Sequence, residues 1–184
     1  MSTDTATALA DMRRWLERAV IGLNLCPFAK AVHVKGQVHY ASSEAADAQG
    51  VLEDFARELD ALLALPARER DTTLLVIPQG MEDFLTFNDV VARAQRIVRK
   101  RRLEGVVQVA SFHPRFVFAG ADEDDVTNFT NRAPWPTLHL LREESMDRAV
   151  AAFPDAARIY ETNMETLRKL GPEGWDALDV GPHA

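Results

Sequence analysis

Several features that mark well-known functional classes are missing from the sequence. It has a single cysteine, Cys26, so a disulfide within the chain and a metal site made of cysteines alone are both excluded. No segment approaches the roughly 20 consecutive apolar residues that cross a bilayer. The N-terminus has no basic stretch leading into an apolar one, as a signal peptide would. We therefore expect a cytoplasmic protein whose thiol stays reduced.

Positive charge is also scarce, because 21 lysines and arginines stand against 28 acids and leave a net charge of -7. Nucleic-acid binding needs a concentrated basic face. The basic run from Arg99 to Arg102 lies at the end of an expected helix, where the helix dipole favours cations. The chain also has no phosphate-binding glycine loop, dinucleotide fingerprint or zinc-protease motif. Neither a nucleic-acid partner nor a membrane partner is expected.

The 184 residues, of which 47% are apolar, suit one globular domain. Apolar residues recur at helical spacing in five segments. The predicted helices are Thr5–Leu23, a second that begins at Ser42 or Ser43 and is closed by Pro66, a third with an apolar face from Phe84 to Val98 that stops at Gly105, a short one from Ser145 to Pro154, and a last one from Asp155 to Leu170. Asp4 or Thr5 is expected at the start of the first helix.

Strands are predicted where apolar residues alternate with polar ones or form short buried runs. The segments are Gln37–Ser42, Thr72–Ile77, Val106–Ala110, Phe116–Phe118 and Thr137–Leu141. Two strand–helix–strand units predict parallel pairs, and the later strands add antiparallel ones. The expected fold is α/β, a mixed β-sheet of about five strands with helices packed on it. It forms a single domain over residues 1–171, followed by a loose C-terminal tail over 172–184.

Cys26 is the first candidate for chemistry. Pro27 cannot continue the first helix. If Pro27 begins a new short helix, Cys26 caps that helix, and the dipole lowers the thiol pKa and favours the nucleophilic thiolate. If Cys26 instead ends the first helix, the dipole acts in the opposite direction. The alternative to both is a buried and unreactive cysteine, as most free cysteines are.

His113 is the second candidate, because it directly follows an expected buried strand. Ligands bind beyond the carboxyl ends of strands in open α/β sheets. A histidine at this position suits a general base, a metal ligand or a group that orients a ligand. The alternative is a structural histidine bound to the backbone at the end of a strand.

The third candidate is the segment from Asn131 to Arg142, in which two prolines flank Trp135 and stiffen the loop. Strand alternation places Arg142 on one face and His139 on the other. We therefore expect His113 and Arg132, rather than His139 and Arg142 together, to accompany Cys26. The guanidinium groups of Arg132 and Arg142 suit a carboxylate or phosphate, unless they pair with nearby acids.

The segments 24–29, 112–114 and 131–142 resemble a bacterial domain-of-unknown-function family, numbered 1415. The resemblance extends from the first helix to about Leu170, and its last segment is the most specific. It implies that the three segments belong together as a signature, which favours functional roles for Cys26, His113, Arg132 and His139. Asn163 matches a further family position and is expected to reach the same site. The resemblance implies no activity.

Three hypotheses for function follow. The first is an enzyme for a small anionic substrate, with Cys26 as nucleophile or thiol donor and His113 or His139 as base. Arg132 would anchor the anion in that enzyme. The second is a metal or haem protein that uses Cys26 and the two histidines, although no pair of ligands at short spacing supports it. The third is a non-catalytic binding or regulatory domain with Trp135 as an exposed anchor. The further candidates for substrate binding are Asn131, Trp135, Arg142 and Asn163, and the sequence specifies no cofactor.

Overall fold

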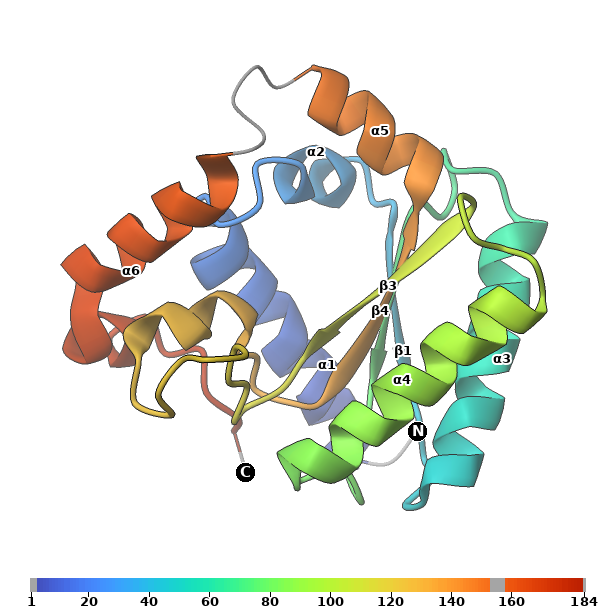
Figure 1. Cartoon of the computed structure of the whole chain (residues 1–184), viewed down its shortest axis with the longest axis horizontal. Coiled ribbons are helices and arrows are strands. Elements are labelled where there is room, and N and C mark those ends of the chain that lie inside the picture. The colour runs from blue at the N-terminus through green and yellow to red at the C-terminus, as the bar shows by residue number, and fades with distance from the viewer. Residues whose placement is uncertain (1–2, 153–157, 184) are drawn as a thin grey trace.

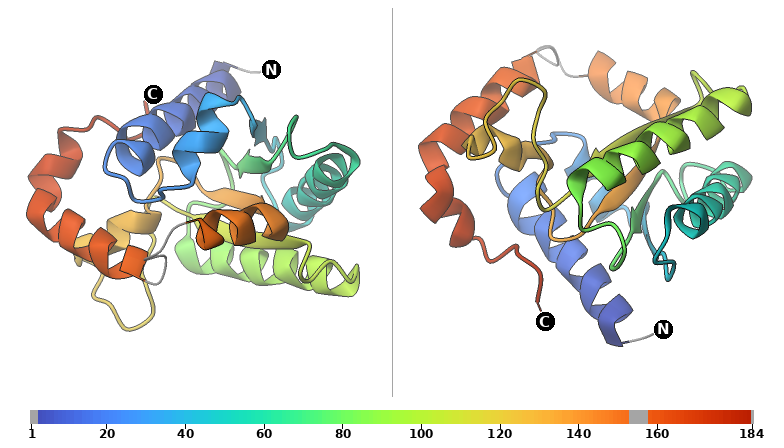
Figure 2. Two further views of the ribbon diagram at one scale, coloured as in Figure 1. Left: turned by 90° about the horizontal axis from the view of Figure 1, so that it is seen from above. Right: turned by 60° about the horizontal axis from the view of Figure 1, so that its bottom comes forward.

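A four-stranded mixed sheet lies at the centre of the molecule, with helices on both faces (Figures 1 and 2). The computed structural model describes residues 3–152 and 158–183. The strands are β1 (Val38–Ser42), β2 (Thr72–Val76), β3 (Val107–Phe112) and β4 (Thr137–Arg142). Their order in the sheet is β1-β2-β4-β3, with β1 and β2 parallel and β4 antiparallel to both of its neighbours. The predicted α/β class and mixed sheet are confirmed.

The strand count differs from the prediction, because Phe116–Phe118 forms no strand. The backbone of this segment is engaged elsewhere. The Phe116 N–H donates to the carbonyl of His113, and the Phe118 N–H donates to the side chain of Asn128. The carbonyl of Phe116 accepts from Arg132. These turn and loop hydrogen bonds leave few backbone groups for pairing with a strand.

The longer helices follow the predicted apolar patterns, whereas the short helices α2 (Ala29–Val34) and η2 (Val126–Asn131, a 3-10 helix) were not predicted as fixed elements. The other helices are α1 (Thr3–Trp15), the π-helical η1 (Leu16–Ile21), α3 (Ala48–Ala64), α4 (Phe84–Lys100), α5 (Glu143–Ala151) and α6 (Ile159–Asp176). The first helix therefore begins at Thr3, ahead of the expected Asp4 or Thr5. Both α2 and η2 are six residues long, which is too short for a clear helical repeat.

Several predicted helix ends are wrong by a few residues. Asp47, not Ser42 or Ser43, caps α3 by accepting from the N–H of Gly50. The chain turns out of α4 at Arg102, which has a φ of 57°, before it reaches Gly105. Ser145 lies inside α5 rather than at its cap. The predicted boundaries at Pro154 and Asp155 lie outside the described residues.

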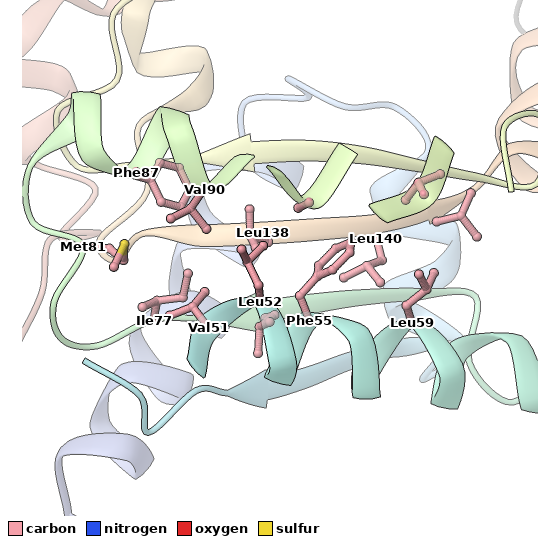
Figure 3. Close-up of a cluster of buried hydrophobic side chains, with 14 of the residues drawn as sticks. Val51, Leu52, Phe55, Leu59, Ile77, Met81, Phe87, Val90, Leu138 and Leu140 are labelled. Atoms are coloured by element: carbon pink, nitrogen blue, oxygen red, sulfur yellow. The ribbon is translucent and has the colours of Figure 1, made fainter. Parts of the chain in front are cut away.

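One face of the sheet packs against α3 and α4. Val51, Phe55 and Leu59 of α3 point toward β4, and so do Phe87 and Val90 of α4, which lies beside α3 on the same face of the sheet (Figure 3). Leu138 and Leu140 of β4 are completely buried in this cluster. Full burial of side chains of this size contributes roughly 1.5–3 kcal/mol each. This face carries the main hydrophobic core.

The opposite face packs against α1 and η1, with Met12, Trp15 and Leu16 in its core. The chain after Gly171 joins this layer and is packed rather than loose. A left-handed Gly171, with a φ of 66°, kinks α6, and the helix continues to Asp176. Val180 is buried, and Arg14 Nε donates to the carbonyl of Asp179 at 2.8 Å. Within residues 3–152 and 158–183, no helix is long and apolar enough to cross a membrane.

Candidate functional site

A cavity of about 750 Å³ lies on the α1 side of the sheet. Its floor is formed by residues of all four strands: Val38, Leu74, Ala110, Phe112, His139 and Leu141. Its other walls come from η1, from the turn and helix around α2, and from α5. Helices α2 and α5 lie at the same end of the molecule, above the end of the sheet (Figure 1). Segments that are far apart in the sequence therefore enclose one space.

The irregular end of the first helix brings Cys26 to this cavity. The π-helical turns of η1 widen the helix, so that the N–H of Leu25 reaches back to the carbonyl of Val20 at 2.9 Å. Asn24 then takes a left-handed conformation with a φ of 54°. Such turns in place of a regular helix end are common at functional sites. Here they turn the chain so that Cys26, Pro27 and Phe28 line the cavity.

Cys26 lies in the turn between η1 and α2 and does not cap α2, whose N-cap is Phe28. The N–H of Cys26 donates back to the carbonyl of Val20 at 3.5 Å. The carbonyl of Cys26 accepts from the N–H of Ala29 at 3.1 Å, and its sulfur accepts from the N–H groups of Phe28 and Ala29. Burial raises the pKa of the thiol, and these two hydrogen bonds lower it by less, so the net shift is upward. At neutral pH the side chain is therefore a neutral thiol.

His139 lies on the floor of the same cavity. Its Nε2 is 2.6 Å from the hydroxyl oxygen of Thr72, and that hydroxyl is 2.7 Å from the carbonyl of Leu140. Burial lowers the pKa of His139 to about 4, so the ring is neutral at pH 7. No hydrogen bond joins the imidazole of His139 to Cys26 or to any described residue other than Thr72. The ring of Phe112 lies beside the imidazole, at 5.8 Å between centroids.

The charged side chains that border the cavity are mostly basic. Lys35, Arg68 and Arg148 are exposed and come from the end of α2, the loop after α3, and α5. Arg148 forms an ion pair with Glu144 at 2.5 Å, and Arg68 one with Glu69 at 3.7 Å. The acid in the lining is Asp71, which accepts from Ser145 Oγ at 2.5 Å. Exposed basic groups therefore border an otherwise largely apolar space.

The structure places His113 away from this cavity, on the α4 side of the sheet. The side chain is fully buried between Phe84 and Phe87, with each ring centroid 5.2 Å away. Its Nδ1 accepts from the N–H of Arg115 at 3.0 Å, and its Nε2 donates to the carbonyl of Met81 at 2.9 Å. Burial lowers its pKa, against smaller opposing contributions. Both ring nitrogens are used in holding loops together.

Arg132 and Asn131 also make structural contacts outside the cavity. Arg132 Nε donates to the carbonyl of Phe116 at 3.1 Å, and an Nη donates to the carbonyl of Glu123 at 2.6 Å. The guanidinium stacks over the ring of Phe129 at 4.9 Å. Asn131 Nδ2 donates to the carbonyl of Ser111 at 3.2 Å. The expected grouping of Arg132 and His113 with Cys26 in one pocket is not what the structure contains.

Trp135 and Asn163 each hold two distant segments of the chain together by a hydrogen bond. Trp135 Nε1 donates to the carboxylate of Asp11 at 3.0 Å, and the ring packs in the α1-side core. Trp135 is therefore not the fully exposed anchor of a partner surface. The buried Asn163 of α6 donates to the carbonyl of Leu25 at 2.8 Å. Asn163 thus holds the turn that presents Cys26, without itself lining the cavity.

Arg142 borders the cavity, but its guanidinium turns to the other side of the strand. It donates to the carbonyls of Leu65 at 2.6 Å and Arg70 at 3.2 Å, and to that of Leu62. These carbonyls belong to the end of α3 and the loop that follows. The predicted alternation of His139 and Arg142 therefore holds, and Arg142 caps a helix end in this structure.

The site also contains residues that the sequence did not single out. They are Thr72, Phe28 and Phe112 in the walls and the exposed Lys35, Arg68 and Arg148. Phe28 and Phe112 lie in the family-like segments 24–29 and 112–114, but nothing in the spacing of the others connects them with the site. Across residues 3–152 and 158–183, no group of three or more His, Cys, Asp or Glu is arranged to hold a metal ion.

Comparison with other proteins adds a family and no activity. No curated protein matches the chain, and no solved structure matches it. One family model matches residues 7–177, from the first turns of α1 to the end of α6, and so covers every residue of the cavity. The chain belongs to the family described as "Protein of unknown function (DUF1415)".

Proposed function

We propose that the protein binds a small molecule with an apolar body and an anionic group in the cavity between the sheet and helices α2 and α5. The observation that carries this proposal is the cavity itself, which combines apolar walls with the exposed basic side chains Lys35, Arg68 and Arg148, called the rim below. Its volume of about 750 Å³ lies within the roughly 300–1,000 Å³ typical of sites for small molecules. Its position beside Cys26 and His139 connects it with two residues of the predicted signature.

The walls favour an apolar body for the ligand. Aromatic and aliphatic side chains, among them Phe28, Leu74 and Phe112, supply most of the lining. Burial of apolar surface against such walls contributes roughly 25 cal/mol per Å². A strongly hydrated ligand would lose its water here without regaining hydrogen bonds, and would bind weakly.

The rim favours an anionic group. Lys35, Arg68 and Arg148 offer ammonium and guanidinium donors, although Arg68 and Arg148 also pair with the exposed Glu69 and Glu144. The carboxylate of Asp71 accepts from Ser145. Because these basic side chains are solvent-exposed, each adds little to the binding energy. Together they favour a ligand with negative charge. A medium-chain fatty acid or an aromatic carboxylate has the required shape and charge. A cytoplasmic location for this binding stays a prediction.

Binding is better supported than covalent catalysis by Cys26. Burial keeps the thiol protonated, and no hydrogen bond connects it with His139 to remove its proton. Nucleophilic cysteines generally have a lowered pKa or a base within hydrogen-bond reach. Cys26 therefore serves in this proposal as a wall of the cavity.

Calorimetric titration with dodecanoate and with dodecanol tests the proposal. We expect dodecanoate to bind, and Ala149→Phe, which fills the cavity from α5, to weaken its binding about tenfold or more. Ala92→Phe on the exposed side of α4 is the matched control and should leave the affinity unchanged. Lack of any binding by the unmodified protein would overturn the proposal.

The charge requirement is tested by the triple variant Lys35→Gln, Arg68→Gln and Arg148→Gln. We expect about a tenfold loss of affinity for dodecanoate and little change for dodecanol, because three exposed ion pairs of modest strength are removed. The control carries the same charge change on α4, as Arg96→Gln, Arg99→Gln and Lys100→Gln. Equal losses in both triple variants would mean that the rim does not select the anion.

Haem is a second candidate, because it is also an apolar body with carboxylates and can take a thiolate or imidazole ligand. The observation that favours it is the presence of both Cys26 and His139 in one cavity with a basic rim. Titration with haemin should then give a saturable absorption band that shifts in Cys26→Ser or in His139→Leu. A spectrum that neither substitution changes would remove haem from consideration.

A further inference from the structure

His139 stands out in the cavity because it is the polar side chain in the middle of an apolar floor. Its neighbours across the sheet are Leu74 of β2 and Ala110 of β3, and Phe112 packs beside its ring. The exposed basic groups Lys35, Arg68 and Arg148 border the same space. The imidazole of His139 therefore borders whatever occupies the cavity.

The hydrogen bonds of Thr72 fix which ring nitrogen carries the proton. A threonine hydroxyl has one proton to donate, and it lies 2.7 Å from the carbonyl of Leu140, which can only accept. With that proton used, the same oxygen must accept from His139, whose Nε2 lies 2.6 Å away. The neutral ring therefore holds its proton on Nε2, and Nδ1 is left as an acceptor. No described residue donates to Nδ1.

An acceptor of this kind is costly to cover with an apolar ligand. When a ligand expels water from the cavity, Nδ1 loses its hydrogen-bond donors unless the ligand supplies one. Sites built around a fixed buried polar group discriminate strongly against ligands that lack its partner. A cationic donor is disfavoured, because the ring is surrounded by apolar walls and the rim is basic. The fitting donor is neutral, such as a hydroxyl or an amide N–H.

We infer that the natural ligand carries a hydroxyl or amide donor on its apolar body, and that His139 Nδ1 recognises this group. The inference rests on the proposed function, because it names the class of ligand for the same cavity. The ligand then has two polar points: an anionic group among Lys35, Arg68 and Arg148, and a donor along the body at His139. His139 acts as the residue that determines specificity, and Thr72 positions it.

Titration with dodecanoate and with a series of monohydroxydodecanoates that differ in hydroxyl position tests the inference. We expect one position to bind about tenfold to a hundredfold more tightly than dodecanoate, since only one position places its hydroxyl at Nδ1. In His139→Phe this preference should disappear, whereas Ala92→Phe on the exposed side of α4 should keep it. Affinities that are equal across the series, or a preference that survives His139→Phe, would overturn the inference and leave the proposed function intact. If neither dodecanoate nor any member of the series binds, both fail.

A second measurement does not depend on the fold of a variant. Nitrogen NMR of the unmodified protein, labelled at histidine, reports which ring nitrogen of His139 carries the proton. We expect the Nε2–H form, with Nδ1 changing its shift on addition of the preferred hydroxy acid and little on addition of dodecanoate. A ring protonated on Nδ1 would overturn the inference, because that nitrogen would then be a donor.

Discussion

The imidazole of His139 and the hydroxyl of Thr72 form one hydrogen-bonded unit across two strands. Thr72 is the first residue of β2, His139 lies in β4, and the N···O distance is 2.6 Å. The same hydroxyl also satisfies the carbonyl of Leu140 in β4. A single threonine thus joins two neighbouring strands and fixes the only aromatic nitrogen base found among the described residues that line the cavity.

Replacing Thr72 by valine removes this unit while keeping the side-chain shape. We expect the free energy of unfolding to fall by about 1–2 kcal/mol, because His139 and a buried carbonyl both lose a partner. Urea denaturation followed by circular dichroism measures the loss. Thr162→Val on the exposed side of α6 is the matched control and should change stability by less than about 0.5 kcal/mol. Equal effects at both positions would contradict the role given to Thr72.

Cys26 should react slowly with alkylating reagents in the folded protein. Its raised pKa means that the thiolate fraction at pH 8 is smaller than for an ordinary cysteine, and burial also limits access. We expect iodoacetamide to modify the native protein at a rate about tenfold or more below that of the urea-unfolded chain. Mass spectrometry over time gives both rates. Dodecanoate should slow the native reaction further, and a native rate equal to the unfolded one would show a thiolate instead.

Local patterns in the sequence were enough to predict most of the fold. The apolar periodicities of α3 and α4 and the short apolar runs of the strands predicted the class and the mixed sheet. Alternation along β4 also predicted that His139 and Arg142 have opposite orientations, as they do. The same rule extended along β3 places His113 on the face of Val107 and Val109, toward α4. That signal could have separated His113 from Cys26 in advance.

The cavity could not be predicted in this way. It depends on β4 inserting between β2 and β3, a pairing between distant segments that no local pattern specifies. It also depends on α2, which has six residues and none of them buried, and so leaves little periodic signal. Cys26 and His139 of the family-like segments line the cavity. Arg132 and Trp135 of the same segments instead make hydrogen bonds that hold loops in place. Sequence alone does not distinguish a polar side chain that lines a cavity from one that holds a loop.

Arg142 is expected to matter for stability and not for ligand binding. Its planar fork reaches carbonyls at the end of α3 and in the following loop, and lysine cannot reproduce that geometry. We expect Arg142→Lys to lower the free energy of unfolding by about 1–3 kcal/mol and to leave the affinity for dodecanoate within about twofold. Arg148→Lys at the rim is the control for stability and should be nearly neutral. A stable Arg142→Lys that fails to bind dodecanoate would assign the guanidinium to the ligand.

Asp11 should make the free energy of unfolding depend on pH in the acid range. Its side chain is 1% exposed and accepts hydrogen bonds from Trp135 Nε1, the N–H of His183 and Arg14. Burial raises the pKa of Asp11, but these hydrogen bonds outweigh it, and the net shift is downward from 3.8. A carboxylate with a lowered pKa in the folded state stabilises the protein at pH values above its unfolded pKa. That contribution is lost as the pH falls below 3.8 and through the folded pKa.

The variant Asp11→Asn removes this titration and keeps the size of the side chain. We expect it to be less stable than the unmodified protein at pH 6, since an amide replaces a charged acceptor of several hydrogen bonds. The gap between the two proteins should narrow at pH 3, where the aspartate is becoming protonated. Urea midpoints at both pH values measure this, with Asp89→Asn on the exposed side of α4 as the control that should not change the gap. A gap that stays constant with pH would mean that Asp11 acts through packing alone, and that the tail from Asp179 to His183 is not held by its charge.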